Sequence, residues 1–268
     1  MTIFPRLLLS ALCAVLVNAG PSVAEPPLVQ GNVRPGWRME GGNQMTALHL
    51  SLRDGWKTYW RAPGDTGIPP SFDWTGSQNV RAVRFHWPRP EVFDVNGLRT
   101  IGYKHQLVLP MEVVPMDPSK PVRLKATVEM GVCSDICVPV SYSFSLGLPK
   151  QGDGDETIRA SLRKRPSSAK EAGLAAISCT VTPTTGGVLL RASMDIPSTG
   201  APETVVVEAG QDGVWVSEAE VQRKGGRLEA SVTMSGPGGS AFALQRQAIT
   251  LTILGRNRAV EIKGCPAP

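Results

Sequence analysis

The sequence predicts an all-β protein made of two antiparallel β-sandwich domains joined by a short helix-containing linker. Apolar and polar residues alternate with period two over many short segments, which is typical of half-buried strands. Stretches rich in glycine and proline, such as residues 62–70 and 87–90, separate these segments and favour turns. Helical periodicity is almost absent outside one short stretch near residue 156. Short strands with this punctuation are typical of β-sandwiches.

The first 24 residues have the features of a secretory signal peptide: Arg6, an apolar run over residues 7–17, and small residues at Ser22-Val23-Ala24. The run is too short to span a bilayer. We therefore expect the mature chain to begin near Glu25 and to be exported, with an uncleaved anchor as the alternative. No later segment approaches 18 uninterrupted apolar residues, so we expect a soluble mature protein that does not insert into the membrane.

The formal net charge of the whole sequence is +5. Loss of Arg6 with the signal peptide would leave 27 basic residues against 23 acidic ones, spread along the chain. Such a mild excess makes no case for a nucleic-acid partner. The triplet Arg163-Lys164-Arg165 is interpreted as a solvated helix end and linker. A nucleic-acid or membrane contact is the less favoured alternative.

Changes in composition divide the mature chain into two domains and a linker. Residues 25–150 form the first predicted sandwich, and residues 175–268 form the second. In the linker, residues 151–174, Asp155 is placed to cap a short helix that Pro166 ends. The expected strands are residues 45–52, 80–87, 107–114, 122–132 and 138–148 in the first domain, and 177–181, 188–192, 204–208, 214–216, 228–234, 249–254 and 260–263 in the second.

Cleavage would also remove Cys13 and leave four cysteines, an even number that indicates an oxidising compartment for an exported chain. Four cysteines allow three connectivities, and the closeness of one pair favours Cys133–Cys137 together with Cys179–Cys265. The second bridge would close a loop of 87 residues. Such a bridge could stabilise its domain by about 4–5 kcal/mol. We assign it a structural role, with a second redox pair as the alternative.

Cys133 and Cys137 lie at the facing ends of two alternating segments joined by Ser134-Asp135-Ile136, a pattern that predicts a β-hairpin. Both cysteines share the parity of the polar residues, so neither is expected to point into the apolar core. A bridge across so short a loop would stabilise the fold poorly. Exposed, strained bridges tend to be labile or catalytic. The favoured hypothesis is thiol–disulfide exchange at this pair, and a structural disulfide is the alternative.

Exchange also requires surroundings that stabilise a thiolate. We expect Lys104 or His105 to supply positive charge near the pair, and Trp60 or Tyr103 to shield it. The sequence does not decide which cysteine attacks the disulfide of a partner. We favour Cys133 as the attacking cysteine.

Other chemistries have less support. The sequence has no Gly-x-Ser-x-Gly elbow and no glycine-rich loop in a phosphate-binding context. His49 and His86 are interpreted as surface or hydrogen-bonded histidines. A Cu(I) site is the metal alternative, and it would combine Cys133 and Cys137 with His105 and a methionine, one of Met111, Met116 and Met130. Neither a zinc site nor a cofactor is expected.

Several motifs in order resemble the N-terminal periplasmic domain of DsbD-type protein-disulfide reductases. The resemblance is strongest to the ScsB-like branch, which is associated with suppression of copper sensitivity. It spans about residues 30–150, and residues 175–268 resemble the second β-domain of that branch more weakly. The motifs are GWKTYWRAPGDTGIPP at 55–70, WPRP at 87–90, Gly102-Tyr103, and VCSDICVP at 132–139.

The resemblance implies an immunoglobulin-like domain whose cysteine pair is Cys133 and Cys137. In that family the pair takes electrons from a membrane-embedded module through a thioredoxin-like domain and passes them to periplasmic thiol oxidoreductases. The sequence contains neither of those two modules, so it would borrow its reductant. Its cysteine spacing is also shorter than that of the DsbD prototype, so the protective cap residues of the prototype are not carried over.

The sequence therefore predicts a periplasmic protein that relays reducing equivalents by dithiol–disulfide exchange. Two alternatives remain open at this point. One is a non-enzymatic binding or assembly module with two structural disulfides, and the other is a periplasmic copper-handling protein.

Overall fold

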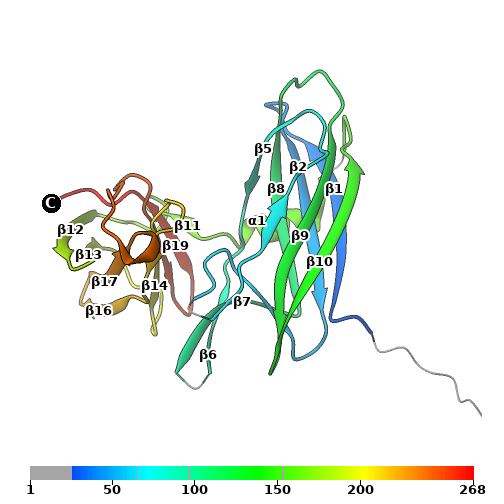
Figure 1. Ribbon diagram of the computed structural model, residues 1–268. Helices are drawn as coiled ribbons and strands as arrows, with labels where there is room; N and C mark the ends of the chain where they lie inside the picture. The colour runs from blue at the N-terminus through cyan, green and yellow to red at the C-terminus, as the bar shows by residue number, and fades with distance from the viewer. Residues whose placement is uncertain (1–25, 65, 96, 153) are drawn as a thin grey trace, which may run out of the picture.

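The computed structural model describes residues 26–64, 66–95, 97–152 and 154–268, so the predicted signal peptide at 1–24 lies outside the described residues. Two β-rich domains lie side by side, the first coloured blue to green in Figure 1 and the second yellow-green to red. Strand pairing in the described chain is antiparallel apart from one short parallel pair. The all-β, two-sandwich class predicted from the alternating segments is confirmed. Among the described residues, no helix is long and apolar enough to cross a membrane.

The first domain consists of two sheets in the part of the chain that the structure describes. One sheet has the order β1-β2-β8-β5, and the other has the order β10-β9-β3-β7-β6 with β4 paired to β9. The bounds in chain order are β1 Val29–Arg38, β2 Gln44–Leu52, β3 Lys57–Tyr59, β4 Ser71–Asp73, β5 Val80–Phe85, β6 Glu91–Val95, β7 Leu98–Lys104, β8 Gln106–Pro115, β9 Arg123–Cys133 and β10 Cys137–Gly147.

The core of this domain lies between its two sheets. Alternate residues of β9, such as Leu124, Val128 and Val132, are buried while their neighbours lie on the outer face. They pack in one cluster with apolar side chains of the opposite sheet, including Leu48 and Leu109. The period-two pattern of the sequence thus corresponds to one buried and one outer face for β9.

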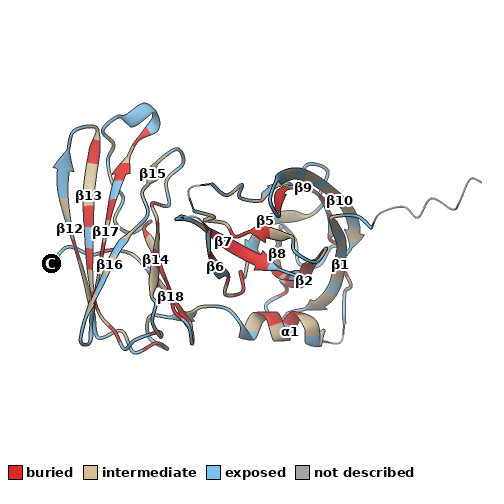
Figure 2. Cartoon of the chain, turned by 90° about the horizontal axis from the view of Figure 1, so that it is seen from below, coloured by how far each residue is buried: buried red, intermediate tan, exposed pale blue. Residues whose placement is uncertain are grey.

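Helix α1, Glu156–Arg163, begins where the sequence predicts. The carboxylate of Asp155 accepts a hydrogen bond from the backbone N–H of Thr157 at 2.8 Å, which caps the helix. Ile158 is fully buried beside Met45 and Ala47 of β2, and Figure 2 shows the buried face of α1 in red. The helix therefore packs on the first domain and is more than a solvated connection.

The second domain also has two sheets within the described residues, in the orders β11-β19-β18-β14 and β12-β13-β17-β15, with β16 paired to β17. Its core contains Leu190, Val232 and Ile253 among other apolar side chains. The bounds are β11 Ser167–Ser168, β12 Ala176–Thr184, β13 Gly187–Asp195, β14 Thr204–Glu208, β15 Trp215–Val216, β16 Glu220–Lys224, β17 Arg227–Ser235, η1 Pro237–Gly239, β18 Thr250–Leu254 and β19 Ala259–Lys263.

The two domains touch through both charged and apolar contacts. Arg61 of the first domain lies 2.8 Å from a carboxylate oxygen of Glu208 and 2.8 Å from one of Glu261, both in the second domain. Leu254 and Ala259 of the second domain are buried in the same apolar cluster as the first-domain core. The apolar contact therefore continues the core of the first domain into the interface.

Candidate active site

Cys133 and Cys137 are the last residue of β9 and the first residue of β10, and they form a disulfide across the end of this hairpin. The two residues are directly opposite in the strand register, with Cα atoms 4.1 Å apart. In the three-residue loop between them, the backbone N–H of Ser134 donates to the carbonyl of Ile136 at 3.0 Å. The long alternating segments on either side hold this geometry because they pair in register along their whole length.

The two cysteines differ in exposure. Cys133 is only 1 % exposed, whereas Cys137 is exposed to solvent. Cys133 does not belong to the apolar core cluster of the domain, as its parity predicts. It is buried instead because β3 pairs with β9 at this point, with Lys57 opposite Cys133, and because the side chain of Tyr59 reaches both sulfur atoms. An incoming group can therefore reach the sulfur of Cys137 more easily.

The hydroxyl of Tyr59 contacts both sulfur atoms of the bridge. Its oxygen lies 3.0 Å from Sγ of Cys133 and 3.4 Å from Sγ of Cys137. Burial raises the pKa of Tyr59, so the hydroxyl keeps its proton. A protonated hydroxyl at this distance can donate a hydrogen bond to a thiolate on either cysteine when the bridge opens.

Gly131 makes room for this tyrosine on the outer face of β9. A Cβ atom at Gly131 would lie 3.2 Å from the ring of Tyr59 and 2.8 Å from Cβ of Ile68. A side chain at residue 131 would therefore clash with Ile68 and crowd the ring of Tyr59. Ile68 covers the same position and is 42 % exposed.

Two lysines lie near the buried cysteine. Lys57 and Lys104 are opposite one another in the pairing of β3 with β7, and both line a surface hollow that also contains Cys133. Their Nζ atoms lie 5.0 and 4.7 Å from the centre of the Phe93 ring. Burial and the neighbouring charge of Lys104 lower the pKa of Lys57. Asp94 and Asp135 line the same hollow and partly offset this positive charge.

Residues 26–149 match the family described as "Thiol:disulfide interchange protein DsbD, N-terminal". This match covers every strand of the first domain and both cysteines of the hairpin. Residues 26–149 form a DsbD-type N-terminal domain. The fold of the chain is also similar to the crystal structure of the N-terminal periplasmic domain of ScsB from Proteus mirabilis. That similarity has a TM-score of 0.66 at 23% sequence identity, and it covers 89% of this chain and 92% of the other. No curated protein matched the sequence.

The residues expected to shield the bridge of the DsbD-type domain are not the ones that do so. Trp60 is fully buried in the core cluster between the sheets. Tyr103 stacks on Trp87, and its hydroxyl donates to the carbonyl of Pro88 at 2.8 Å. Both expectations were wrong because each side chain points into the sandwich, whereas Tyr59 lies on the outer face beside Gly131.

Of the two cations expected near the bridge, one lies there and the other does not line the hollow. Lys104 lines the hollow beside Cys133. His105 is absent from that lining, and its side chain is 73% exposed with Nδ1 3.8 Å from Asp54. Lys57 is the second cation of the hollow, and it lies in the motif at 55–70, in which the sequence indicated no role for this lysine.

The side chains considered for copper are scattered over the DsbD-type domain. Met111 and Met130 are buried in the core cluster between the sheets. Met116 follows β8, at the end of the sandwich where β9 begins, and β9 then runs ten residues to Cys133. Ten residues of strand span roughly 33 Å, so Met116 lies far from the bridge. Within the described residues, no group of three or more His, Cys, Asp or Glu side chains is arranged to hold a metal ion.

The remaining histidines occupy hydrogen-bonded positions on the DsbD-type domain. His49 lies 3.2 Å from the side-chain oxygen of Gln106. His86 lies 3.2 Å from the carboxylate of Glu112, and burial lowers its pKa although the carboxylate acts in the opposite direction. Neither residue lines the hollow that contains Cys133.

The second disulfide joins Cys179 of β12 to Cys265, which follows β19. Both residues are buried in the core of the second domain, at 0 % and 1 % exposure. Arg246 donates to the carbonyl of Cys179 at 2.8 Å and to that of Cys265 at 3.3 Å. This bridge is inaccessible to an attacking thiolate in the folded domain and connects one sheet to the tail that follows the other.

Proposed function

We propose that this protein carries out thiol–disulfide exchange at Cys133 and Cys137 in the periplasm. The observation that carries the proposal is the contact of the Tyr59 hydroxyl with both sulfur atoms of a bridge that joins a buried residue, Cys133, to an exposed one, Cys137. The family description as a thiol:disulfide interchange protein supports the same reaction. The bridge of the second domain is proposed to have only a structural role.

The exposed sulfur atom is proposed to receive the reductant. A thiolate of a reduced partner attacks Sγ of Cys137, the Cys133–Cys137 bond breaks, and a mixed disulfide forms between the partner and Cys137. Cys133 leaves as a thiolate, which the Tyr59 hydroxyl stabilises by donating a hydrogen bond. A second thiol of the partner then attacks its own sulfur in the mixed disulfide. This step releases Cys137, so two electrons have moved from the partner to this protein.

The reduced pair is proposed to pass these electrons to an oxidised acceptor. Cys137 attacks the acceptor disulfide as a thiolate, and Cys133 then attacks Cys137 in the resulting mixed disulfide. The acceptor leaves with two thiols, and the original bridge is restored. This order makes Cys137 the attacking cysteine and Cys133 the resolving one, which replaces the choice of Cys133 made from the sequence.

The partners are proposed from the family resemblance. The donor would be a membrane-embedded reductase that acts through its thioredoxin-like domain, and the acceptors would be periplasmic thiol oxidoreductases. An exposed loop between the cysteines fits this role because Ile136 is 66 % exposed beside the accessible sulfur. A partner can therefore approach Cys137 from solvent.

Single cysteine substitutions test the proposal when the reduced variants are mixed with an oxidised thioredoxin-like protein, whose disulfide a thiolate can attack. In Cys133→Ser the mixed disulfide at Cys137 should accumulate, because Cys133 is missing as the resolving thiol. In Cys137→Ser no mixed disulfide should form at the buried Cys133. The matched control is Cys179→Ala/Cys265→Ala, which removes the other bridge and should still exchange at the hairpin. Exchange that survives in both single variants would contradict the proposal.

A further inference from the structure

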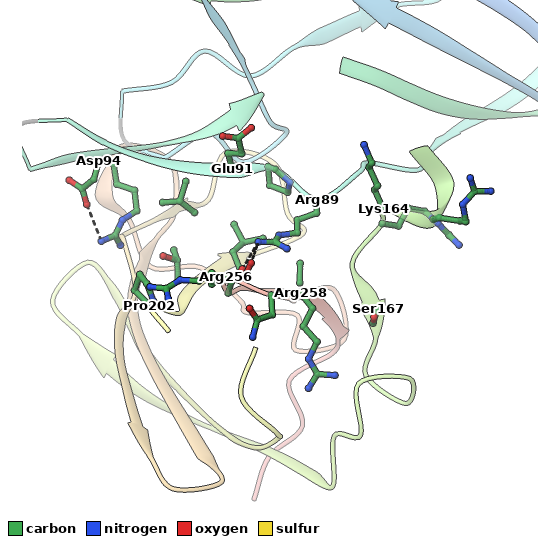
Figure 3. A pocket seen from close by; sticks show the side chains of 18 residues that line it. Arg89, Glu91, Asp94, Lys164, Ser167, Pro202, Arg256 and Arg258 are labelled. Atoms are coloured by element: carbon green, nitrogen blue, oxygen red, sulfur yellow. Dashed lines mark hydrogen bonds and ion pairs between the residues drawn. The ribbon is translucent and has the colours of Figure 1, made fainter. Parts of the chain in front are cut away.

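A wide cleft lies between the two domains and is separate from the hollow that contains Cys133, although Val92 and Asp94 of β6 line both. Its volume is about 920 Å³, and segments of both domains form its walls (Figure 3). The first domain supplies the turn before β6 and the end of α1, and the second supplies the turn between β18 and β19. Clefts of this size at domain interfaces are common places for small ligands.

Positive charge is concentrated in this cleft. Among the residues that the structure describes, seven basic and two acidic side chains line it, which gives a formal excess of five positive charges. The formal net charge of the entire sequence is also +5. Of the two acidic side chains, Asp94 lies 3.6 Å from Arg99 and is thereby partly neutralised. Like charges gathered in a concave surface attract an ion of opposite sign.

Some of these cations hold the walls together. Arg89 donates to the carbonyl oxygens of Gly255 and Arg256 at 2.6 and 2.8 Å, which ties the first domain to the turn of the second. Arg258 donates to the carbonyl of Pro197 at 3.2 Å. Their charges remain in the cleft, because a carbonyl oxygen carries no net charge.

Two other cations of the cleft make no such hydrogen bonds to the walls. The side chains of Lys164 and Arg256 form no hydrogen bond or ion pair with any other residue that the structure describes. Both are exposed, and they come from different domains, as Figure 3 shows. They are therefore free to bind a ligand from two sides of the cleft.

From this arrangement we propose that the cleft binds a small organic anion with two or more phosphate or carboxylate groups. Guanidinium groups match the oxygen pairs of both kinds of group, and the lysine adds a further charged donor. A single inorganic ion would fill little of the volume. The apolar side chains Val92, Pro202 and Leu254 in the lining can contact the carbon part of an organic ligand. This proposal is independent of the exchange reaction at Cys133 and Cys137.

Calorimetric titration of the intact mature chain tests the proposal at fixed ionic strength, with citrate as the carboxylate probe and pyrophosphate as the phosphate probe. At least one of them should bind with one-to-one stoichiometry. Lys164→Gln/Arg256→Gln should weaken that binding by at least roughly tenfold, because two charged hydrogen-bond donors are lost. The probe that binds more tightly identifies the preferred anionic group.

The matched control is Lys150→Gln/Arg191→Gln. These two exposed cations lie outside the cleft and also lack a described partner, so the control removes the same charge and should leave the affinity within about twofold. Circular dichroism would verify that both double variants are folded. Three results would overturn the proposal: neither probe binds, the control variant weakens binding equally, or a hexaglutamate peptide binds more tightly than either probe. The last result would indicate an acidic protein segment as the natural ligand.

Discussion

The two sulfur atoms of the Cys133–Cys137 bridge have different surroundings, and in the proposed exchange this difference favours attack on the sulfur of Cys137. A disulfide breaks more readily when the sulfur that leaves does so as a stabilised thiolate. Cys133 is buried beside the Tyr59 hydroxyl, whereas Cys137 faces solvent. Attack at Cys137 therefore sends the negative charge to the sulfur that already has a hydrogen-bond donor.

Replacement of Tyr59 by phenylalanine tests this role at the scale of one atom. Loss of a hydrogen bond to a charged group costs about 1.5–3 kcal/mol. Reduction of the bridge by dithiothreitol should therefore be slower by roughly 10- to 100-fold. The pKa of the Cys133 thiol should rise, which pH-dependent alkylation of the reduced protein would measure.

Tyr142→Phe is the matched control for that substitution. Tyr142 lies on β10, and its hydroxyl has no hydrogen-bond partner among the described residues. This variant should be reduced at the rate of the unchanged protein. Equal rates for Tyr59→Phe and Tyr142→Phe would show that the hydroxyl of Tyr59 has no part in the reaction.

At this scale the sequence indicated the cysteine pair and Lys104 but missed Tyr59. The spacing of the two cysteines is a local feature, so it can be recognised without the fold. The position of Tyr59 depends on the pairing of β3 with β9, which joins residues more than 70 positions apart. Parity along one strand cannot reveal which distant strand lies beside it.

At the scale of the elements, the hairpin β9–β10 and the short strand β3 form one functional unit. The hairpin presents the cysteines, and β3 brings Lys57 and Tyr59 to the end of β9. Gly131 is the position on β9 where the two parts meet most closely. The site therefore depends on backbone packing as well as on side-chain chemistry.

Gly131→Ala should disturb this unit. The added Cβ would press on Ile68 and on the ring of Tyr59, and overpacking of this kind typically costs about 1–3 kcal/mol. We expect a lower urea midpoint and slower reduction of the bridge. Gly147→Ala, at the end of β10, meets no atom within 4 Å and should change neither quantity. Equal effects of the two substitutions would contradict this account of Gly131.

An ion pair in the second domain predicts how stability depends on pH. Burial alone would raise the pKa of Glu203, but hydrogen bonds from Arg223 and Thr199 outweigh it and lower the pKa from 4.5 to about 2. A lowered folded-state pKa stabilises the fold above the unfolded value, and this contribution is lost as the pH falls from about 4.5 to about 2.

Urea unfolding at pH 6 and pH 3 would measure this effect. The unchanged protein should lose more stability between these two pH values than Glu203→Gln, which has no carboxylate to protonate at this position. An equal loss in both proteins would show that Glu203 does not contribute to the acid sensitivity.

The strands with the longest unbroken alternation could be predicted from the sequence, whereas several short or interrupted strands could not. The alternation over β9 and β10 is long enough to indicate both strands and their turn. Strand β1 was missed because Gly31, Pro35 and Gly36 interrupt its pattern, and its pairing shifts register between Arg34 and Trp37. Strands β3 and β4 have three residues each, which is too short for a period-two signal.

At the scale of the whole molecule, the second domain is fixed beside the first by contacts that no local pattern could indicate. Arg61 comes from the segment 55–70 of the first domain, yet its carboxylate partners lie about 150 and 200 positions further along the chain. Helix α1 likewise packs on the first domain through Ile158, whereas the sequence indicated only a helix within the linker 151–174. The basic cleft arises only when the domains lie together.

The most direct test of the central claim is the reduction potential of each bridge in the intact mature chain. The protein would be equilibrated in glutathione or dithiothreitol buffers and alkylated, and its cysteine peptides would be identified by mass. Cys133–Cys137 should open at about −180 to −270 mV, in the range of known oxidoreductases, while Cys179–Cys265 stays closed. If both bridges open only below about −300 mV, both are structural and the exchange function is wrong.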